Sequence, residues 1–351
     1  MSVPPRRTTT TARPRPAAGT MPPASQTHAA TQGGHRPHTD GPSLWPAVSF
    51  LRRVRQGIDG GQDPLSSLAG ATVALPVDAR ESLEAIRRRL SGGYTEDEWG
   101  FDEEFAEAAM PFMEFLHRQW WRVDVDGILN VPSHGRGLLV SNHAGSFFPW
   151  DAFMVGTSIL EEHPLPRFAR FLVLNWAFEL PFLSTAIRKF GGVPASPYNA
   201  IRLLEQDELV GVFPEGVKGT GKDFKDRYRL QRFGRGGFVE IALRTGAPIV
   251  PVAVVGSEEI YPKITESAAL ARLTGAPFFP ITPTFPLLGP LGAVPLPSKW
   301  RIEFCDPIEV ASYGPEAAGD RRLVFELSER VRGTIQEKLY ENLVKRGSAF
   351  P

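Results

Sequence analysis

The sequence is poor in cysteine and in long apolar runs. Its 351 residues contain one cysteine, Cys305, which excludes an internal disulfide framework and weakly favours a reducing compartment. No uninterrupted apolar stretch reaches the roughly 18 residues that a membrane-spanning helix needs, and the beginning of the chain lacks the apolar core of a secretory signal. Acidic and basic residues each number 39, so the net charge of zero gives no general attraction to nucleic acid. These absences favour a globular protein with one large domain or two modest ones.

Acidic residues are also missing from the start of the chain. Residues 1–43 are rich in proline, threonine and arginine and are expected to form a disordered basic tail, because such a composition buries too little apolar surface to fold. Residues 44–100 are expected to form a helical extension, with apolar residues at helical spacing over 44–57 and 78–90. The first of these helices faces either the core or a membrane surface. The main domain is expected over residues 101–346.

Short apolar runs alternate with helical patterns in the main domain. Strands are expected over residues 137–140, 168–174, 209–213, 248–255 and 300–304. Helices are expected over residues 102–121, 152–160, 176–190, 197–206, 237–246 and 323–344. Apolar, β-branched strands alternating with helices predict an α/β fold with a mostly parallel central sheet flanked by helices, preceded by the N-terminal helical extension.

A histidine and an aspartate stand at the ends of two neighbouring elements. His143 follows the expected strand over 137–140, and Asp151 stands at the head of the next expected helix. The two side chains are therefore expected to face each other, in the geometry of a general base held by a carboxylate. A structural histidine–aspartate pair is the alternative.

Three motifs in order carry a resemblance to a known family. Asn142-His143 with Asp151 comes first, Phe213-Pro214-Glu215-Gly216 follows a strand, and Val250-Pro251-Val252-Ala253 lies within another. Over roughly residues 100–345 the chain resembles the glycerolipid acyltransferase superfamily, of the lysophosphatidate acyltransferase type.

The resemblance implies a reaction and its two main residues. It implies transfer of a fatty acyl group from acyl-CoA or acyl-carrier protein to a glycerolipid hydroxyl such as that of lysophosphatidate, in phospholipid biosynthesis. His143 would be the general base and Asp151 would fix its tautomer. No metal or organic cofactor is expected, because the thioester is already activated. The family usually has four residues between this histidine and aspartate, whereas seven (144–150) lie between them here.

Further residues are expected to bind substrate. Asn142 and the Phe213-Pro214-Glu215-Gly216 motif are assigned to substrate binding, with Glu215 on the acceptor side. The glycine-laced run over 218–235 has seven basic and two acidic residues, and a phosphate of coenzyme A or of a lipid headgroup is its expected ligand, with a solvated loop as the alternative. Its assigned residues are Lys218, Lys222 and Arg227.

The sequence leaves other functions open. The family's phosphate-binding arginine is missing from Gly191–Pro197, so a neutral lipid alcohol such as diacylglycerol or a fatty alcohol is an alternative acceptor. A lipid hydrolase is disfavoured, because no Gly-x-Ser-x-Gly motif is present. A catalytically silent lipid-binding protein becomes the better reading if the long spacing keeps Asp151 away from His143.

Two apolar features point toward a membrane. Residues 276–297 carry no charge and are expected to dock on a bilayer or to line the acyl-chain groove, with an irregular core connection as the alternative. Trp120-Trp121 suits either a membrane interface or core packing. We therefore expect a cytoplasmic protein that is peripheral on the membrane. Its expected partners are a membrane lipid acceptor, acyl-CoA or acyl-carrier protein, and the membrane surface, but not nucleic acid.

Overall fold

The computed structural model describes residues 96–350 except 145–147, 180–182 and 276. The expected tail over 1–43 and the helices expected over 44–57 and 78–90 lie outside the described residues.

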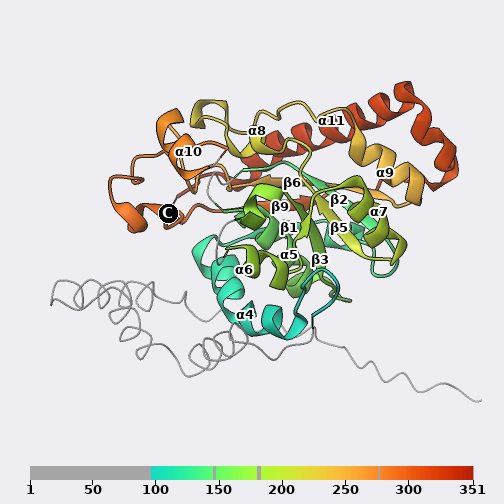
Figure 1. Ribbon diagram of the computed structural model, residues 1–351, viewed down its shortest axis with the longest axis horizontal. Coiled ribbons are helices and arrows are strands. Elements are labelled where there is room, and N and C mark those ends of the chain that lie inside the picture. The colour runs from blue at the N-terminus through green and yellow to red at the C-terminus, as the bar shows by residue number, and fades with distance from the viewer. Residues whose placement is uncertain (1–95, 145–147, 180–182, 276, 351) are drawn as a thin grey trace, which may run out of the picture. The chain divides into compact units, whose positions relative to one another are not determined.

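Seven strands of the described part of the chain form one sheet in the order β1-β9-β6-β2-β5-β3-β4 (Figure 1). Their bounds are β1 Asp124–Asp126, β2 Gly137–Ser141, β3 Ala169–Val173, β4 Val193–Pro194, β5 Leu209–Val212, β6 Ile249–Val255 and β9 Arg301–Phe304. The five strands from β6 to β4 are parallel, whereas β9 pairs antiparallel with β6 and parallel with β1. The predicted class, a mostly parallel α/β fold, is confirmed.

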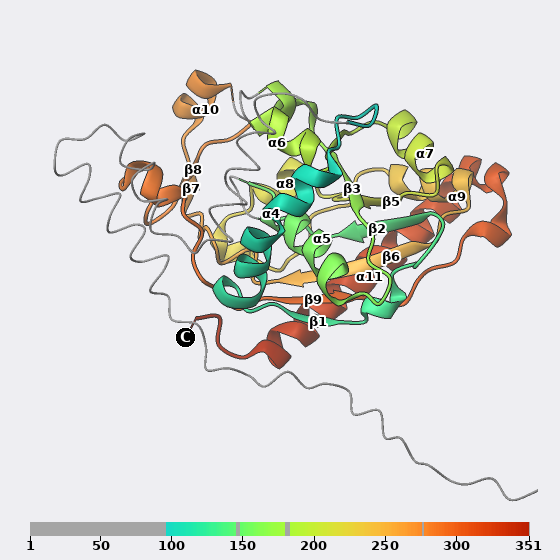
Figure 2. The same ribbon diagram turned by 90° about the horizontal axis from the view of Figure 1, so that it is seen from below.

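Helices cover both faces of this sheet (Figure 2). Their bounds are α4 Glu103–Phe115, α5 Trp150–Glu162, α6 Leu183–Lys189, α7 Pro197–Glu205, α8 Val217–Thr220, α9 Gly237–Thr245, α10 Ala268–Thr274 and α11 Arg321–Arg346. Shorter pieces are η1 Leu116–Trp120 (a π-helix) and the 3₁₀ turns η2 Ile128–Asn130, η3 Asn175–Glu179, η4 Phe224–Asp226, η5 Gly289–Ala293, η6 Ala311–Tyr313 and η7 Pro315–Gly319. A two-residue pair, β7 Thr265–Glu266 with β8 Pro280–Ile281, stands apart from the main sheet.

The apolar strands pack against helices on both sides, which explains why they show no polar alternation. In β2, Leu138 and Val140 pack in one core with α7, α9 and α11, whereas Leu139 packs in the other with α4 and α5. All five β2 residues are buried. The sheet thus lies between two helical layers, and the β2–β5–β6 centre is the rigid platform of the molecule.

The first described helix supports the lower layer in Figure 1. Asp102 caps α4 by accepting a hydrogen bond from the Phe105 amide at 3.0 Å, and the chain continues as η1 up to Trp120. Trp121 is fully buried, stacks on Trp300 with ring centroids 4.8 Å apart, and donates its indole N–H to the Leu296 carbonyl. Of the two readings for the tryptophan pair, core packing is therefore confirmed for Trp121.

Helix α11 closes the upper layer. Its 26 residues begin after Asp320, whose side chain accepts hydrogen bonds from the Arg322 and Leu323 amides. Val331, Ile335 and Leu339 are completely buried in the core beneath it. Among the residues that the structure describes, none of the helices combines the length and the apolar character needed to cross a membrane.

Candidate active site

His143 and Asp151 meet at the end of strand β2. The Asp151 Oδ2 lies 2.7 Å from the His143 Nδ1, so the longer spacing between them still closes the pair. A carboxylate at Nδ1 favours the tautomer with the proton on that nitrogen, which leaves Nε2 as a proton acceptor. The His143 Nε2 has no hydrogen-bond partner within the described residues. The predicted geometry of a histidine held by a carboxylate is therefore present.

Asp151 is fixed by helix α5. It occupies the first turn of α5 and is completely buried. Its Oδ2 also accepts a hydrogen bond from the Ala144 amide at 2.8 Å, and its Oδ1 accepts one from the Ala152 amide at 2.9 Å. A buried carboxylate with several N–H donors keeps a single orientation. Asp151 therefore holds both the imidazole of His143 and the backbone beside it.

Glu215 holds the backbone of His143 rather than facing solvent. Its Oε1 accepts a hydrogen bond from the His143 amide at 3.0 Å, and its Oε2 accepts one from the Gln231 amide at 2.7 Å. The side chain is buried. Both oxygens are thus occupied by protein donors. Glu215 therefore positions the backbone of His143, and the substrate contact that the sequence suggested for it stays a prediction.

Asn142 is likewise occupied within the protein. Its Oδ1 accepts the Val254 N–H at 2.8 Å, and its Nδ2 donates to the Val254 carbonyl at 2.9 Å. This amide continues the strand pairing between β2 and β6 one step beyond Ser141. Asn142 is fully buried and anchors the loop that carries His143. The substrate contact expected for it stays a prediction.

Lys222 lies beneath the site and not at its surface. Its ammonium is 2.9 Å from the Glu258 Oε1 and 3.4 Å from the Glu215 Oε2, and its side chain is only 5% exposed. Burial raises the pKa of Glu258 to about 7, while the attraction of Lys222 opposes that rise. Burial alone would lower the pKa of Lys222, but Glu258 and Glu215 outweigh it and raise that pKa. In this structure the ammonium of Lys222 pairs with two buried carboxylates, and the phosphate contact expected for it stays a prediction.

Lys218 and Arg227 are the two assigned cations that remain exposed. Lys218 follows the Phe-Pro-Glu-Gly turn in α8, beside a surface hollow that Gln231 and Lys263 also line. The Arg227 guanidinium stacks over the Phe224 ring, 4.4 Å from its centroid, and donates to the Phe224 carbonyl. Only Lys218 of the three predicted cations is thus exposed without a partner in the described residues.

An apolar pocket of about 330 Å³ opens beside His143. Phe213 stacks on the imidazole with ring centroids 4.2 Å apart, and Pro214 and Gly216 line the same pocket. The other walls come from α5, β3, α6 and the segment around Pro277, which lie far apart in the sequence. Three of the four residues of the Phe-Pro-Glu-Gly motif therefore line this pocket.

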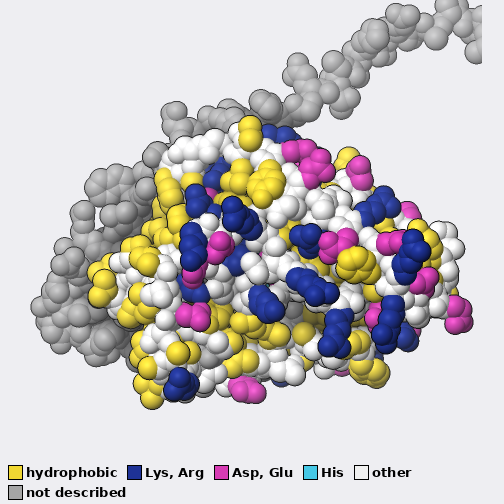
Figure 3. Space-filling model, turned by 90° about the horizontal axis from the view of Figure 1, so that it is seen from above, with side chains coloured by type: hydrophobic (Ala, Val, Ile, Leu, Met, Phe, Trp, Pro, Cys, Tyr) yellow, Lys and Arg dark blue, Asp and Glu magenta, His cyan; other side chains and the backbone are white. Residues whose placement is uncertain are grey.

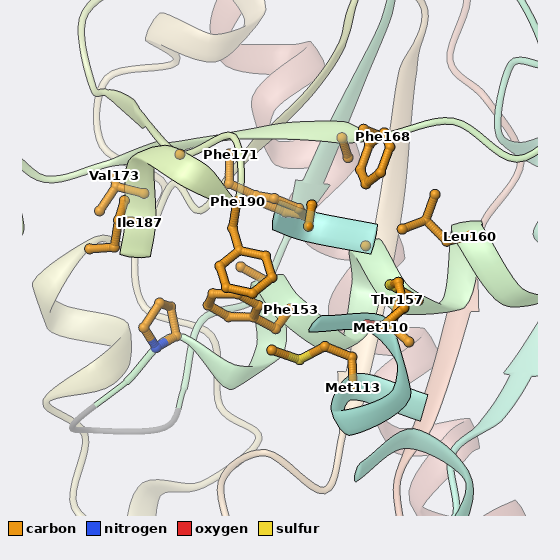
Figure 4. A pocket seen from close by; sticks show the side chains of 16 residues that line it. Met110, Met113, Phe153, Thr157, Leu160, Phe168, Phe171, Val173, Ile187 and Phe190 are labelled. Carbon is orange, nitrogen blue, oxygen red and sulfur yellow. The ribbon is translucent and has the colours of Figure 1, made fainter. Parts of the chain in front are cut away.

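A second, smaller apolar pocket adjoins the first. Its volume is about 70 Å³, and Figure 4 shows Phe153, Phe190, Ile187 and Met113 converging on it from α5, α6 and α4. Five residues line both pockets: Pro149, Ala152, Phe171, Val173 and Ile187. The two pockets thus form one apolar region, with the imidazole of His143 at one end and α4 at the other.

Comparison with known proteins places the chain in a family. The family model described as Acyltransferase matches residues 122–255. An uncharacterized protein of Mycobacterium tuberculosis is 49% identical over 305 residues, which cover 86% of this chain and 85% of that protein. A 1-acyl-sn-glycerol-3-phosphate acyltransferase of Borreliella burgdorferi is 24% identical over 145 residues, 40% of this chain and 54% of that protein. The crystal structure of the 1-acyl-sn-glycerophosphate acyltransferase of Thermotoga maritima aligns over 87% of this chain and 97% of its own, with 19% identity and a TM-score of 0.47.

The chain contains a domain of the acyltransferase family, of the glycerolipid type, over residues 122–255. The family match contains the histidine–aspartate pair, the Phe-Pro-Glu-Gly turn and all of β6. The family predicted from these motifs is confirmed, and with it the class of enzyme, an acyltransferase.

Sequence reasoning missed several residues that shape the site. The backbone N–H of Gln231 donates a hydrogen bond to Glu215, and the Glu258 carboxylate pairs with the ammonium of Lys222. Phe171 lines both apolar pockets. Glu258 follows the end of β6 with its acidic neighbour Glu259. These two adjacent glutamates, shortly after a buried strand, are the sequence feature that could have indicated a buried cluster of charged side chains.

Proposed function

We propose that this enzyme transfers a fatty acyl group from acyl-CoA or acyl-carrier protein to the hydroxyl of a glycerolipid such as lysophosphatidate. The observation that carries the proposal is the His143–Asp151 contact at the mouth of an apolar pocket. The name of the Borreliella burgdorferi relative, a 1-acyl-sn-glycerol-3-phosphate acyltransferase, supports the choice of acceptor.

His143 acts as the general base in this proposal. Its Nε2 takes the proton of the acceptor hydroxyl while the hydroxyl oxygen attacks the thioester carbonyl. The carbon–sulfur bond then breaks, the ester forms, and the thiolate leaves with the proton from the imidazole. Asp151 stabilises the transient imidazolium across the 2.7 Å contact. The thioester is already activated, so the proposal includes no metal and no organic cofactor.

The acyl chain occupies the apolar pockets in this proposal. The larger pocket holds the thioester end beside His143, and the smaller one extends it between α4, α5 and α6. Aromatic side chains such as Phe153 and Phe190 line the inner part. Burial of each methylene contributes about 0.8 kcal/mol, so a long chain binds mainly through this surface.

The apolar segment after α10 brings the enzyme to its lipid substrate. Leu287, Leu288 and Leu291 are 83%, 57% and 58% exposed, and a cluster of exposed leucines is typical of a membrane-contacting surface. Pro277 and Phe278, at the beginning of the same segment, line the pocket that contains His143. Figure 3 shows hydrophobic side chains gathered at one side of the molecule, over α10. We propose peripheral binding to a membrane through this segment.

The test compares the wild-type enzyme with His143→Ala and Asp151→Asn. Each protein is incubated with a labelled long-chain acyl-CoA, or with acyl-carrier protein as donor, and with lysophosphatidate or glycerol 3-phosphate. We expect His143→Ala to lose nearly all ester formation, and Asp151→Asn to lower kcat by about two to four orders of magnitude, since it favours the wrong tautomer. A chelator should leave the wild-type rate unchanged.

Three results would contradict the proposal. Ester formation that is equal in the wild type and in His143→Ala would remove His143 as the base. Release of free fatty acid without any ester, with every acceptor and both donors, would indicate a hydrolase, and lipid binding without turnover would indicate a binding protein.

A neutral lipid alcohol is the second candidate acceptor. The Gly191–Pro197 segment contains no arginine, and Lys222 is buried in an ion pair, so two expected phosphate contacts are missing near His143. Including diacylglycerol and a fatty alcohol in the same assay distinguishes the two acceptors. A higher kcat/KM for either alcohol than for lysophosphatidate would favour this second function.

A further inference from the structure

A second hollow lies next to the catalytic pocket and is rich in arginine. It is formed by the turn before α9 and by the first two turns of α11, and it contains the side chains of Arg232, Arg235 and Arg321. All three side chains are exposed, and none of them makes an ion pair within the described residues. What distinguishes these three arginines is that they line one hollow together.

The backbone of this hollow is also open to an anion. Gly236 caps α9 in the left-handed conformation (φ 83°), and the amides of Gly237 and Phe238 have no backbone acceptor within the described residues. A side chain placed at Gly234 or Gly237 would meet no atom within 4 Å, so the turn borders open space. Free amides at a helix start and arginine guanidinium groups both bind phosphate.

Two carboxylates also line the hollow, and they do not cancel the arginines. Glu329 is paired with Arg332 at 3.0 Å. Glu240, in the first turn of α9, is the second. Three arginines against one uncompensated carboxylate leave an excess of positive charge at this place.

The hollow shares a wall with the catalytic pocket. Phe233, Gly234 and Arg235 line both. Arg235 therefore borders the pocket that contains His143, whereas Arg232 and Arg321 line only the adjoining hollow. Figure 3 shows basic side chains distributed over this upper face of the molecule.

We propose that Arg232, Arg235 and Arg321 bind the phosphate groups of the coenzyme A donor, an inference that rests on the proposed acyl transfer. The position favours the donor over the acceptor. In lysophosphatidate the phosphate is only a few bonds from the reacting hydroxyl, so it must bind inside the His143 pocket. In coenzyme A the long pantetheine arm separates the thioester from a pyrophosphate and a 3′-phosphate. Those phosphates must bind well away from His143, at the edge of its pocket or beyond it. Arg235 borders this pocket and Arg232 and Arg321 line the adjoining hollow, so three arginines match the several negative charges.

The test measures binding of free coenzyme A by calorimetry, without acceptor and without turnover. Wild-type enzyme is compared with Arg235→Gln, Arg321→Gln and the double variant, and Arg330→Gln is the matched control, an exposed arginine of α11 outside the hollow. We expect each single variant to weaken coenzyme A binding about tenfold, as the loss of one charge-assisted contact does, and the control to bind like the wild type.

Dephospho-coenzyme A, which lacks the 3′-phosphate, provides a measurement that needs no variant. The wild type should bind it more weakly than coenzyme A, and the Arg235→Gln/Arg321→Gln variant should discriminate less between the two. In steady-state kinetics the variants should raise the KM for acyl-CoA and leave the KM for lysophosphatidate unchanged.

Several outcomes would overturn this assignment. A wild type that does not bind coenzyme A, variants that bind it with unchanged affinity, or a raised KM for lysophosphatidate alone would each do so. The last result would place the phosphate of the acceptor at these arginines. Arginine-dependent binding of coenzyme A without any acyl transfer would instead support the site and remove the proposed reaction, so the two failures are distinguishable.

Discussion

At the scale of single residues, the imidazole of His143 is fixed from three directions. Asp151 holds its Nδ1, Glu215 holds its backbone amide, and Phe213 stacks on its ring. A side chain held in this way loses little conformational entropy on reaching the reactive geometry. The precision of the site therefore depends on residues that need not contact substrate.

Lys222 offers a direct test of that dependence. We expect Lys222→Met to reduce the free energy of unfolding by about 3–5 kcal/mol, because it leaves the carboxylates of Glu215 and Glu258 buried without a counter-charge. The double variant Lys222→Met/Glu258→Gln should recover part of this loss. Urea denaturation measures both. A Lys222→Met enzyme of unchanged stability but with a raised KM for a phosphate-bearing acceptor would restore the substrate-binding role that the sequence suggested.

The sequence was informative about residues at the ends of elements and less so about buried polar side chains. His143 and Asp151 could be paired because a strand end and the next helix start determine where they lie. The partners of Asn142 and Lys222 could not be identified from the sequence, because Val254 and Glu258 come from a later strand and the loop after it. Residue type shows that an amide or ammonium needs a partner but does not show where that partner is.

At the scale of elements, His117 joins the π-helical end of α4 to α5. Its Nε2 lies 3.0 Å from the Ser158 hydroxyl, and its buried Nδ1 has no hydrogen-bond partner among the residues that the structure describes. Burial lowers the pKa of His117 from 6.5 to about 4. The contact between these two helices is therefore built around a neutral imidazole.

This contact predicts a pH-dependent stability. At pH 5 the unfolded chain binds a proton at His117 that the folded protein does not, so stability is lost as the pH falls from 6.5 towards 4. We expect the wild type to lose about 2 kcal/mol more than His117→Gln between pH 7 and pH 5, from the shift in pKa. Parallel urea titrations at the two pH values give this difference. Equal losses in the two proteins would mean that His117 is already charged in the folded state.

The order of elements was largely predictable, whereas two strand directions were not. Every strand and helix expected in residues 101–346 is present, because buried parallel strands and amphipathic helices have distinct apolar periods. The antiparallel direction of β9 and its pairing with the short β1 were not predicted. Apolar periodicity indicates that a strand is buried but contains no information about its direction or its neighbours.

At the scale of the whole molecule, the exposed leucines after α10 predict a membrane-binding surface. We expect Leu287→Glu/Leu288→Glu to reduce binding to lipid vesicles at least tenfold, since both side chains are exposed and a charge opposes insertion. The matched control is Leu129→Glu, because Leu129 is 74% exposed but lies in η2, before the first residue of β2. Flotation with vesicles of mixed neutral and anionic phospholipid measures binding.

The same variants separate membrane binding from chemistry. The leucine variant should retain its kcat on a detergent-solubilised acceptor and lose rate only on vesicles. Equal flotation of the wild type, Leu287→Glu/Leu288→Glu and Leu129→Glu would exclude these leucines as the docking surface.

The antiparallel strand β9 has a consequence for how the chain is made. Residues 122–255, the region shared with the family model, end at the last residue of β6, and β9 follows only at Arg301. Until β9 has been synthesised, one side of the apolar strand β6 has no neighbour and β1 has no sheet to join. An open apolar edge invites pairing with another chain. A polypeptide that stops at residue 255 would contain every catalytic residue proposed above. It would still be prone to aggregate, because it lacks β9, the strand that covers the open edge of β6.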